Sequence, residues 1–228
     1  MASTTGKALG NGSPEVAEYV REAFATSDAV YAEIEARAAA AGMPAIHVSG
    51  FDARLLEVIA LAAGARRIVE IGTLAGLSGV ALCRALPPGG VLHTFEMNPR
   101  HAEVATESFR RAGFTDRVTI HLGPAIEKLP EIEALGPFDL AFIDAEKPGY
   151  PAYLEWCARN LRVGGVVLAD NTFADGAVAL TEDQTPESNR ATRAAIREFN
   201  ARLADPRGVF RAMMVPTGEG LSMGVRVR

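Results

Sequence analysis

Five apolar runs of strand length alternate with helical patterns through the middle of the chain, and this alternation limits the possible folds more than any other feature. Parallel strands need a long crossover between them, and a helix is the usual one. The order therefore predicts an α/β fold with a doubly wound parallel sheet and helices on both faces. The runs are Arg67–Ile71, Val91–Glu96, Arg117–His121, Phe138–Ile143 and Val163–Ala169. The helical patterns between them lie near Ser78–Leu86, Pro99–Ala112, Pro124–Leu129 and Tyr150–Leu161.

Three further helices are predicted ahead of the sheet. The first starts at Ser13–Pro14, where a capping serine precedes a proline at the first helical position. The second is capped by Ser27 and ends at Gly42. The third runs from about Phe51 to Ala63.

The last part of the chain departs from the alternation. A helix near Asn189–Ala204 is followed by two strand patterns, Val209–Val215 and Leu221–Val227. The short turn Pro216–Gly220 between them predicts an antiparallel hairpin. Residues 172–188 form a long polar loop that acts either as a lid or as a simple surface excursion.

Composition restricts the class of protein. The chain has 228 residues, of which 48% are hydrophobic and 22% charged, as in ordinary globular domains. The formal net charge is −5 and there is no long basic run, which argues against a nucleic acid as the main ligand. No apolar run approaches the ~20 residues that a membrane span needs, and the start lacks the features of a secretory signal. We therefore expect a cytoplasmic protein without a membrane partner.

The same features suggest how the chain is divided. We expect residues 1–12, which are rich in Gly, Ser and Thr, to be disordered. Residues 13–228 are expected to form a single domain in which residues 13–63 cover the active site. Cys83 and Cys157 lie inside apolar helical patterns, as expected for buried free thiols in a reducing compartment.

Polar residues follow the fourth and fifth of the apolar runs, at the point where each run ends. The first group is Asp144–Lys147 and the second is Asp170–Asn171. Because ligands of open α/β sheets bind outside the carboxyl ends of the strands, these side chains are expected around one point. Asp144, Asp170 and Asn171 would suit a hard divalent cation, with Lys147 as a base beside it. The alternatives are a helix-capping Asp144, an ordinary turn at Asp170–Asn171 and a solvent-facing Lys147.

A glycine-rich turn joins the first strand to its helix at Val69–Gly79, with glycines at positions 72, 76 and 79. Glycine lets the backbone approach a ligand closely. The spacing is not that of the G-x-G-x-x-G dinucleotide motif, because Leu74 replaces the second glycine. The acidic Glu70 suits a ligand with an amino group better than a phosphate. A generic turn between strand and helix is the alternative.

Two further strand ends complete a candidate nucleoside site. Glu96 ends the second strand, where an acidic side chain can accept both hydroxyls of a ribose. The alternative for Glu96 is a charge at a helix N-terminus ahead of Pro99. Gly123–Ala125 ends the third strand, and Ala125 is small enough to lie against an adenine.

Together these motifs resemble the cation-dependent O-methyltransferases, the family of caffeoyl-CoA and catechol O-methyltransferases. The stretches that carry the resemblance are Val69–Thr73, Phe138–Lys147 and Gly164–Asn171, and the match runs from about Met43 to the C-terminus. The resemblance implies a seven-stranded, Rossmann-like sheet with an antiparallel last strand, in agreement with the predicted hairpin. It also implies S-adenosylmethionine as the cofactor.

The resemblance also implies a set of cofactor-binding residues, which are Val48, Glu70, Gly72, Thr73, Ser78, Glu96, Ala125 and Asp144. Glu70 would meet the methionine amino group, and Ser78 would bind the carboxylate at a helix N-terminus. Two positions depart from the family pattern. Leu77 stands where many relatives have Tyr, and Glu96 stands where the ribose-binding acid is usually Asp.

The activity implied is methyl transfer to a hydroxyl of a catechol-like or phenolic small molecule, in a homodimer. A phenol has a pKa near ~10, so a divalent cation, Mg²⁺ or else Ca²⁺ or Mn²⁺, would help to ionise it. Lys147 would then act as general base and Asp144 as a catalytic metal ligand. Residues 28–41 lack a basic cluster for a coenzyme A thioester, which favours a free phenolic acceptor.

Two other functions remain open at this point. A nicotinamide-dependent oxidoreductase would need the missing G-x-G-x-x-G motif, and it gives no reason for Asp170–Asn171. A nucleoside-binding module without catalysis would not require the complete set of two aspartates, an asparagine and a lysine.

Overall fold

The computed structural model describes residues 13–24 and 28–228. In this part of the chain one seven-stranded sheet has the order β3-β2-β1-β4-β5-β7-β6. The strands are β1 (Arg67–Ile71), β2 (Val91–Glu96), β3 (Val118–Leu122), β4 (Phe138–Ile143), β5 (Leu161–Ala169), β6 (Phe210–Val215) and β7 (Leu221–Arg226). Strands β1 to β5 pair in parallel, whereas β7 is antiparallel to both β5 and β6. The predicted doubly wound sheet and its antiparallel last strand are confirmed.

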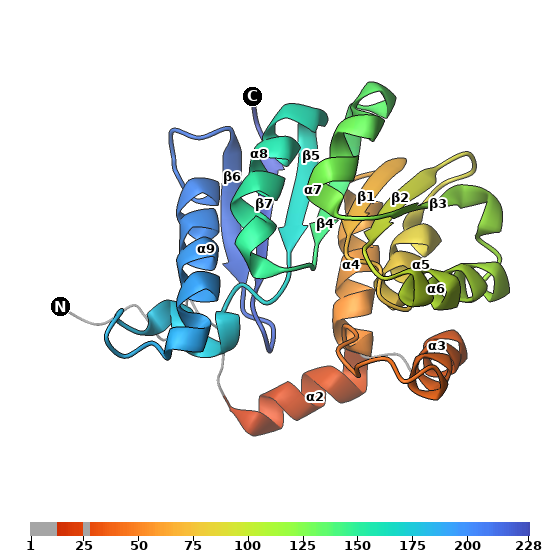
Figure 1. The fold of residues 1–228 in the computed structure, drawn as a ribbon, viewed down its shortest axis with the longest axis horizontal. Coiled ribbons are helices and arrows are strands. Elements are labelled where there is room, and N and C mark those ends of the chain that lie inside the picture. Colours follow the sequence, from red (N-terminus) through yellow and green to blue (C-terminus); the bar gives the residue numbers. More distant parts are fainter. Residues whose placement is uncertain (1–12, 25–27) are drawn as a thin grey trace.

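Helices cover both faces of the sheet (Figure 1). The helices are α2 (Pro14–Phe24), α3 (Ala29–Ala40), α4 (Gly50–Ala62), α5 (Leu77–Ala85), α6 (Pro99–Arg111), α7 (Ala125–Lys128), α8 (Tyr150–Asn160) and α9 (Glu187–Leu203). Side chains alternate between two buried clusters along each strand, so that Ile68 packs with α3 to α6 and Val69 packs with α8 and α9. This is why apolar residues occur on both faces of the central strands, with Glu70 in β1 as a buried exception.

Strand register places the ends of the central strands at one level. Ile71, the last residue of β1, pairs with Phe95 of β2 and with Ile143 of β4. Ile143 in turn pairs with Ala169, the last residue of β5. The residues that follow these strands therefore start from the same edge of the sheet, as the sequence predicted.

Several element boundaries differ from prediction. β5 begins at Leu161, two residues before the predicted start, because Leu161 still pairs with Phe138 of β4. The short helix α7 continues as a 3₁₀-helix, η2 (Leu129–Leu135). The polar loop at 172–188 contains another, η4 (Ala174–Ala179), and α9 starts at Glu187 inside the predicted loop.

The N-terminal helices begin near the predicted positions. Ser27, the predicted cap of the second helix, and residues 1–12 lie outside the described residues. The observed cap of α3 is Asp28, whose carboxylate accepts a hydrogen bond from the Val30 N–H at 2.9 Å. Ser49 caps α4 in the same way.

Two expectations about the whole chain can be compared with the structure. None of the helices in the described ranges is both long enough and apolar enough to cross a membrane. Cys83 and Cys157 are both buried and free, as predicted.

Candidate active site

A cavity of about 1570 Å³ opens at the carboxyl ends of β1, β2, β4 and β5. Residues of α2 and of the segment before α4 also line it, so the N-terminal helices cover part of the site. In Figure 1, α2 lies along the lower end of the molecule, separate from the helices that pack on the sheet. The predicted residues that line the cavity are Val48, Gly72, Thr73, Ser78, Glu96, Ala125, Asp144, Lys147, Asp170 and Asn171.

The glycine-rich turn after β1 passes very close to the end of β4. Gly72 has φ +102°, and a Cβ there would lie 2.8 Å from the carbonyl carbon of Asp144 and closer still to its oxygen. Only glycine fits such an approach with this backbone conformation. Leu74 also has positive φ, and its N–H donates to Glu96 Oε2 at 2.8 Å. Contacts with the ends of β4 and β2 therefore fix this turn beside the cavity.

Glu70 is fully buried beneath this turn and is absent from the cavity lining. Its carboxylate accepts hydrogen bonds from Ser78 Oγ and Thr94 Oγ1, both at 2.7 Å. Burial raises the pKa of Glu70 to about 7, and these two hydrogen bonds oppose that rise. In the structure Glu70 therefore orients Ser78, and its direct contact with an amino group stays a prediction.

Glu96 lies at the end of β2 on the cavity wall. Its second carboxylate oxygen, Oε1, accepts from the Asn98 N–H at 2.9 Å, and His101 Nδ1 is 3.6 Å from the same atom. Ala125 begins α7 on the same wall. These positions suit the ribose and adenine contacts, which stay predictions.

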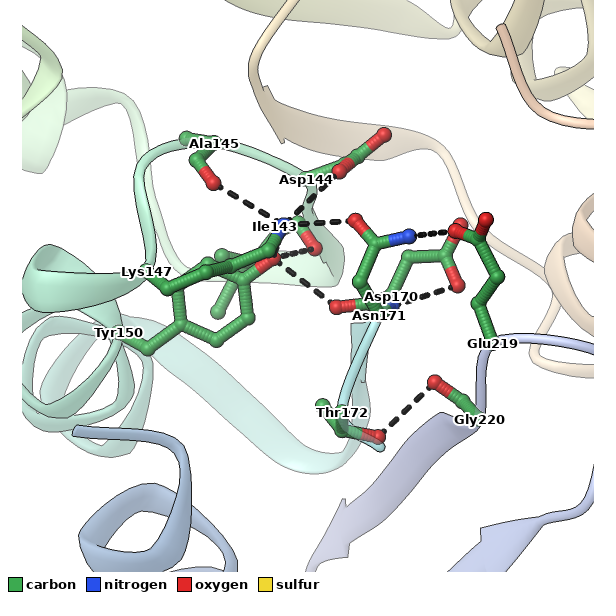
Figure 2. A network of polar contacts seen from close by, with 10 residues as sticks. All are labelled: Ile143, Asp144, Ala145, Lys147, Tyr150, Asp170, Asn171, Thr172, Glu219 and Gly220. Carbon is green, nitrogen blue, oxygen red and sulfur yellow. Dashed lines mark hydrogen bonds and ion pairs between the residues drawn. The ribbon is translucent and has the colours of Figure 1, made fainter. Parts of the chain in front are cut away.

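Lys147 lies among the candidate metal ligands (Figure 2). Its Nζ donates to Asn171 Oδ1 at 2.6 Å and is 3.3 Å from Asp144 Oδ1. The lysine therefore points into the site, which is not the solvent-facing position of the alternative. An ammonium group between two oxygens of the predicted set marks a place where the protein stabilises positive charge.

The hydroxyl of Tyr150 helps to hold this lysine in place. Lys147 Nζ donates to the Tyr150 hydroxyl at 2.8 Å and to the Ala145 carbonyl at 3.1 Å. The hydroxyl in turn donates to the backbone carbonyl of Asp170 at 3.0 Å. Tyr150 is fully buried. Through these hydrogen bonds the lysine is connected to the segments that follow both β4 and β5.

Asp170 is a carboxylate that the protein buries without a full counter-charge. Burial raises its pKa to about 7, and the charges of Asp144, Asp52 and Glu219 act in the same direction. A hydrogen bond from the Asn171 N–H at 2.8 Å opposes this rise only in part. Negative charge in excess at a buried point is what a bound cation would compensate.

The donor set is smaller than a complete metal site. Across residues 13–24 and 28–228, no three His, Cys, Asp or Glu side chains gather in a way that could hold a metal ion. Asp144 and Asp170 supply two carboxylates and Asn171 an amide oxygen. Mg²⁺ usually keeps several waters and few protein ligands, so two carboxylates and an amide fit its chemistry.

Comparisons with known proteins agree with this geometry. A family model described as O-methyltransferase matches residues 21–227. A catechol O-methyltransferase of Niastella koreensis is 40% identical over 189 residues, which cover 82% of this chain and 85% of that protein. The chain belongs to the O-methyltransferase family.

Solved structures of O-methyltransferases have the same fold. The enzyme TomG of Streptomyces achromogenes, described as involved in tomaymycin synthesis and solved in complex with SAM, has a TM-score of 0.84 at 32% identity, over 94% of this chain and 96% of that one. An O-methyltransferase of Bacillus cereus in complex with SAH has a TM-score of 0.81 at 35% identity, over 93% and 97%. The family predicted from the residues is confirmed, and with it the assignment of the chain as an enzyme.

Four residues of this O-methyltransferase site were missed in the sequence. Tyr150 and Tyr153 follow Lys147 in α8; the helical pattern predicts packing roles for Tyr153 and Trp156, and it singles out no role for Tyr150. Trp156 is buried as expected, but Tyr153 lines the cavity and donates a hydrogen bond to Glu146. Asp52 lies in the first turn of the predicted helix Phe51–Ala63, and Glu219 lies in the turn of the hairpin, where neither was given a role in the site. The only available signal was the position of Glu219 in the hairpin turn Pro216–Gly220.

Two of the four histidines line the cavity as well. They are His47, in the segment before α4, and His101, on α6. The other two, His93 and His121, face each other across β2 and β3 with 3.1 Å between ring nitrogens. No contact in the described residues brings any of them to the Asp144 and Asp170 carboxylates, so the structure gives no imidazole a place beside the candidate metal ligands.

Proposed function

We propose that the protein transfers a methyl group from S-adenosylmethionine to a hydroxyl of a catechol-like or phenolic small molecule, with the help of a divalent cation. The observation that carries this proposal is the meeting of Asp144, Asp170, Asn171 and Lys147 in the cavity that also contains the glycine-rich turn. A methyl donor and an ionised acceptor would then share one space. Relatives named catechol O-methyltransferase support the acceptor class.

The cofactor would lie along the ends of β1 and β2. The close approach of Gly72 to Asp144 leaves the turn without side-chain bulk on that side. Ser78 is at the N-terminal end of α5, where free backbone N–H groups favour a carboxylate. Thr73, Val48 and Ala125 line the same cavity and complete the predicted contacts. The SAM and SAH complexes of related enzymes support this choice of cofactor.

The metal would be held by Asp144, Asp170 and Asn171. When bound, such a cation lowers the pKa of a coordinated hydroxyl, and S-adenosylmethionine supplies an electrophilic methyl group. Lys147, once it is a neutral amine beside the bound cation, would accept the proton of the acceptor hydroxyl at Nζ, which Tyr150 and the Ala145 carbonyl hold in place. The buried setting strengthens each of these electrostatic contacts.

The acceptor would enter between α2, η4 and the turn after β6. Val16 and Val20 of α2 supply apolar wall, and Asp52, Asp175 and Glu219 supply negative charge. Carboxylates at this entrance oppose a polyanionic coenzyme A ester by repulsion between like charges. A free diol or phenol fits this wall better.

A metal-supplemented screen of diols and phenols tests the proposal. We expect the full chain to methylate at least one diol, chelator to abolish turnover and Mg²⁺ to restore it. Full turnover after exhaustive chelation would refute the role of the metal. Asp170→Ala should lose activity but still bind S-adenosylhomocysteine in calorimetry, because Asp170 is not part of the cofactor set.

We also propose a homodimer, on the basis of the family resemblance. The exposed Tyr19 and Phe24 on α2 support it, because a partner subunit could bury these large apolar side chains. Sedimentation should show a species of about twice the 24.1 kDa chain mass. A 24 kDa species at micromolar concentration would reject this proposal. We keep a cytoplasmic location as a proposal as well, in view of the two free thiols.

A further inference from the structure

The turn between β6 and β7 reaches the candidate metal site, although it belongs to neither the predicted metal set nor the cofactor set. Its Glu219 lines the cavity, and the carboxylate accepts a hydrogen bond from Asn171 Nδ2 (Figure 2). We propose that Glu219 is a positioning residue that fixes the amide of Asn171 with its oxygen toward the cation. This inference rests on the metal dependence proposed above.

The two ends of the Asn171 amide are chemically different. The Oδ1 atom is an acceptor and can bind a cation, whereas the Nδ2 group is a donor and would repel one. A half-turn of the amide exchanges the two ends without changing its shape. An ionised carboxylate can only accept hydrogen bonds, so Glu219 can pair only with the Nδ2 end. Its position therefore selects the orientation that a metal site needs.

Lys147 selects the same orientation from the other side in this structure. As an ammonium group its Nζ can only donate, and it donates to Asn171 Oδ1 at 2.6 Å. That oxygen is also the atom that a cation would take. When a cation binds Oδ1, the hydrogen bond between Glu219 and Nδ2 still holds the opposite end of the amide.

Backbone hydrogen bonds hold Glu219 in place, so its position does not depend on its own side chain. The Thr172 N–H donates to the Gly220 carbonyl at 2.9 Å, and the Phe173 N–H donates to the Glu219 carbonyl at 3.0 Å. The Thr172 hydroxyl adds a further bond to the Gly220 carbonyl at 2.9 Å. Gly220, with φ +80°, lies against the Phe173 ring, where a Cβ would be 2.6 Å from Cγ. The turn and the loop after β5 are therefore one unit.

The backbone of Asn171 limits the freedom of its side chain further. Asn171 has φ +55°, in the left-handed region that asparagine tolerates better than most residues. Its N–H is already engaged by Asp170 Oδ1 at 2.8 Å. The hydrogen bond to Glu219 then restricts the rotation of the amide. Groups that orient a metal ligand in this way typically change metal affinity by 10- to 100-fold.

The test measures Mn²⁺ binding without turnover. Free Mn²⁺ is followed by electron paramagnetic resonance while it is titrated into the full chain saturated with S-adenosylhomocysteine. The variants are Glu219→Ala, Asn171→Asp and the double variant, and Glu182→Ala removes an exposed carboxylate that does not line the cavity. Affinity for S-adenosylhomocysteine and the melting temperature check that each variant is folded. Should Glu219→Ala not fold, Glu219→Gln replaces it, since its amide can pair with either end of Asn171.

We expect Glu219→Ala to weaken Mn²⁺ binding by roughly 10- to 100-fold and Glu182→Ala to leave it unchanged. In the Asn171→Asp background both side-chain ends are oxygens, so the loss of Glu219 should cost clearly less. An equal loss in both backgrounds would mean that Glu219 acts through its charge or as a ligand, and it would overturn the inference. So would an unchanged affinity in Glu219→Ala. A wild-type protein that binds no Mn²⁺ would instead overturn the proposed metal dependence, and this inference with it.

Discussion

Gly72→Ala should damage this enzyme far more than an ordinary glycine substitution, because two separate costs meet at one position. Gly72 has φ +102°, and a side chain in the positive-φ region costs roughly 1–2 kcal/mol. The added Cβ would also collide with the Asp144 carbonyl, whose oxygen lies more than 1 Å inside the 3.0 Å limit for real contacts. Overpacking of this kind typically costs about 1–3 kcal/mol.

The collision cannot be relieved by a small local shift. The Gly72 N–H donates to the Phe95 carbonyl at 3.1 Å, and the Asp144 N–H donates to the Ile71 carbonyl at 2.8 Å. Moving either segment breaks a hydrogen bond at the end of the sheet. We therefore expect a total loss of about 2–5 kcal/mol in the free energy of unfolding, with weaker binding of S-adenosylhomocysteine as a second effect.

Gly113→Ala is the matched control. Gly113 has φ +81°, but a Cβ there would meet nothing within 4 Å. The free energy of unfolding of this variant should fall only by the cost of a side chain at positive φ, about 1–2 kcal/mol. Its affinity for the cofactor should stay normal. Urea unfolding of the two variants, with calorimetry for the ligand, gives the comparison. If Gly72→Ala is no less stable than Gly113→Ala, the turn after β1 does not pass as close to the end of β4 as the structure shows.

Three other perturbations test the rest of the site. Glu96→Ala should weaken S-adenosylmethionine binding by roughly 10- to 100-fold in calorimetry, and unchanged affinity would mean that the ribose is held elsewhere. Lys147→Ala should lower kcat by about 10²–10⁴-fold at pH 7, less at high pH, without weakening cofactor or metal binding; a normal kcat would exclude it as the base. Because burial raises the pKa of Glu70 to about 7, the folded state binds this proton more tightly than the unfolded state, so stability should fall as pH rises from about 4.5 to 7. Glu70→Gln should make that fall smaller in urea unfolding at several pH values, and an unchanged slope would contradict the raised pKa.

The sequence predicted the sheet well because its central strands are buried on both faces. β4 lies between β1 and β5 and is buried and apolar from Leu140 to Ile143, and this local pattern can be read without knowledge of distant parts of the chain. Edge strands carry a weaker signal, and β3 was misplaced by one residue at each end. The 3₁₀-helix η4 was hidden because Asp175 and Gly176 interrupt it with positive φ values in a polar segment.

That Asp144 and Asp170, the candidate metal ligands, lie together was predictable for the same reason, whereas their surroundings were not. Asp144 and Asp170 follow neighbouring parallel strands, so local pattern alone places them together. Glu219 reaches them because β7, and not β6, lies beside β5, which depends on how the hairpin docks. Tyr150 resembles any buried helix residue until its hydroxyl is seen to contact Lys147. Contacts made across the fold leave no periodic trace in the sequence.

The end of β4 would give the proposed cofactor and acceptor halves of the site a fixed relation. The backbone of Asp144 is bonded to Ile71 and packed against Gly72, which belong to the cofactor side. Its side chain contacts Lys147, which belongs to the acceptor side. Methyl transfer depends on the alignment of two reactants, and a misplacement of about 1 Å can cost 10²-fold in rate. With one residue shared by both halves, neither can shift without the other, so substitutions on the cofactor turn are expected to alter metal binding as well.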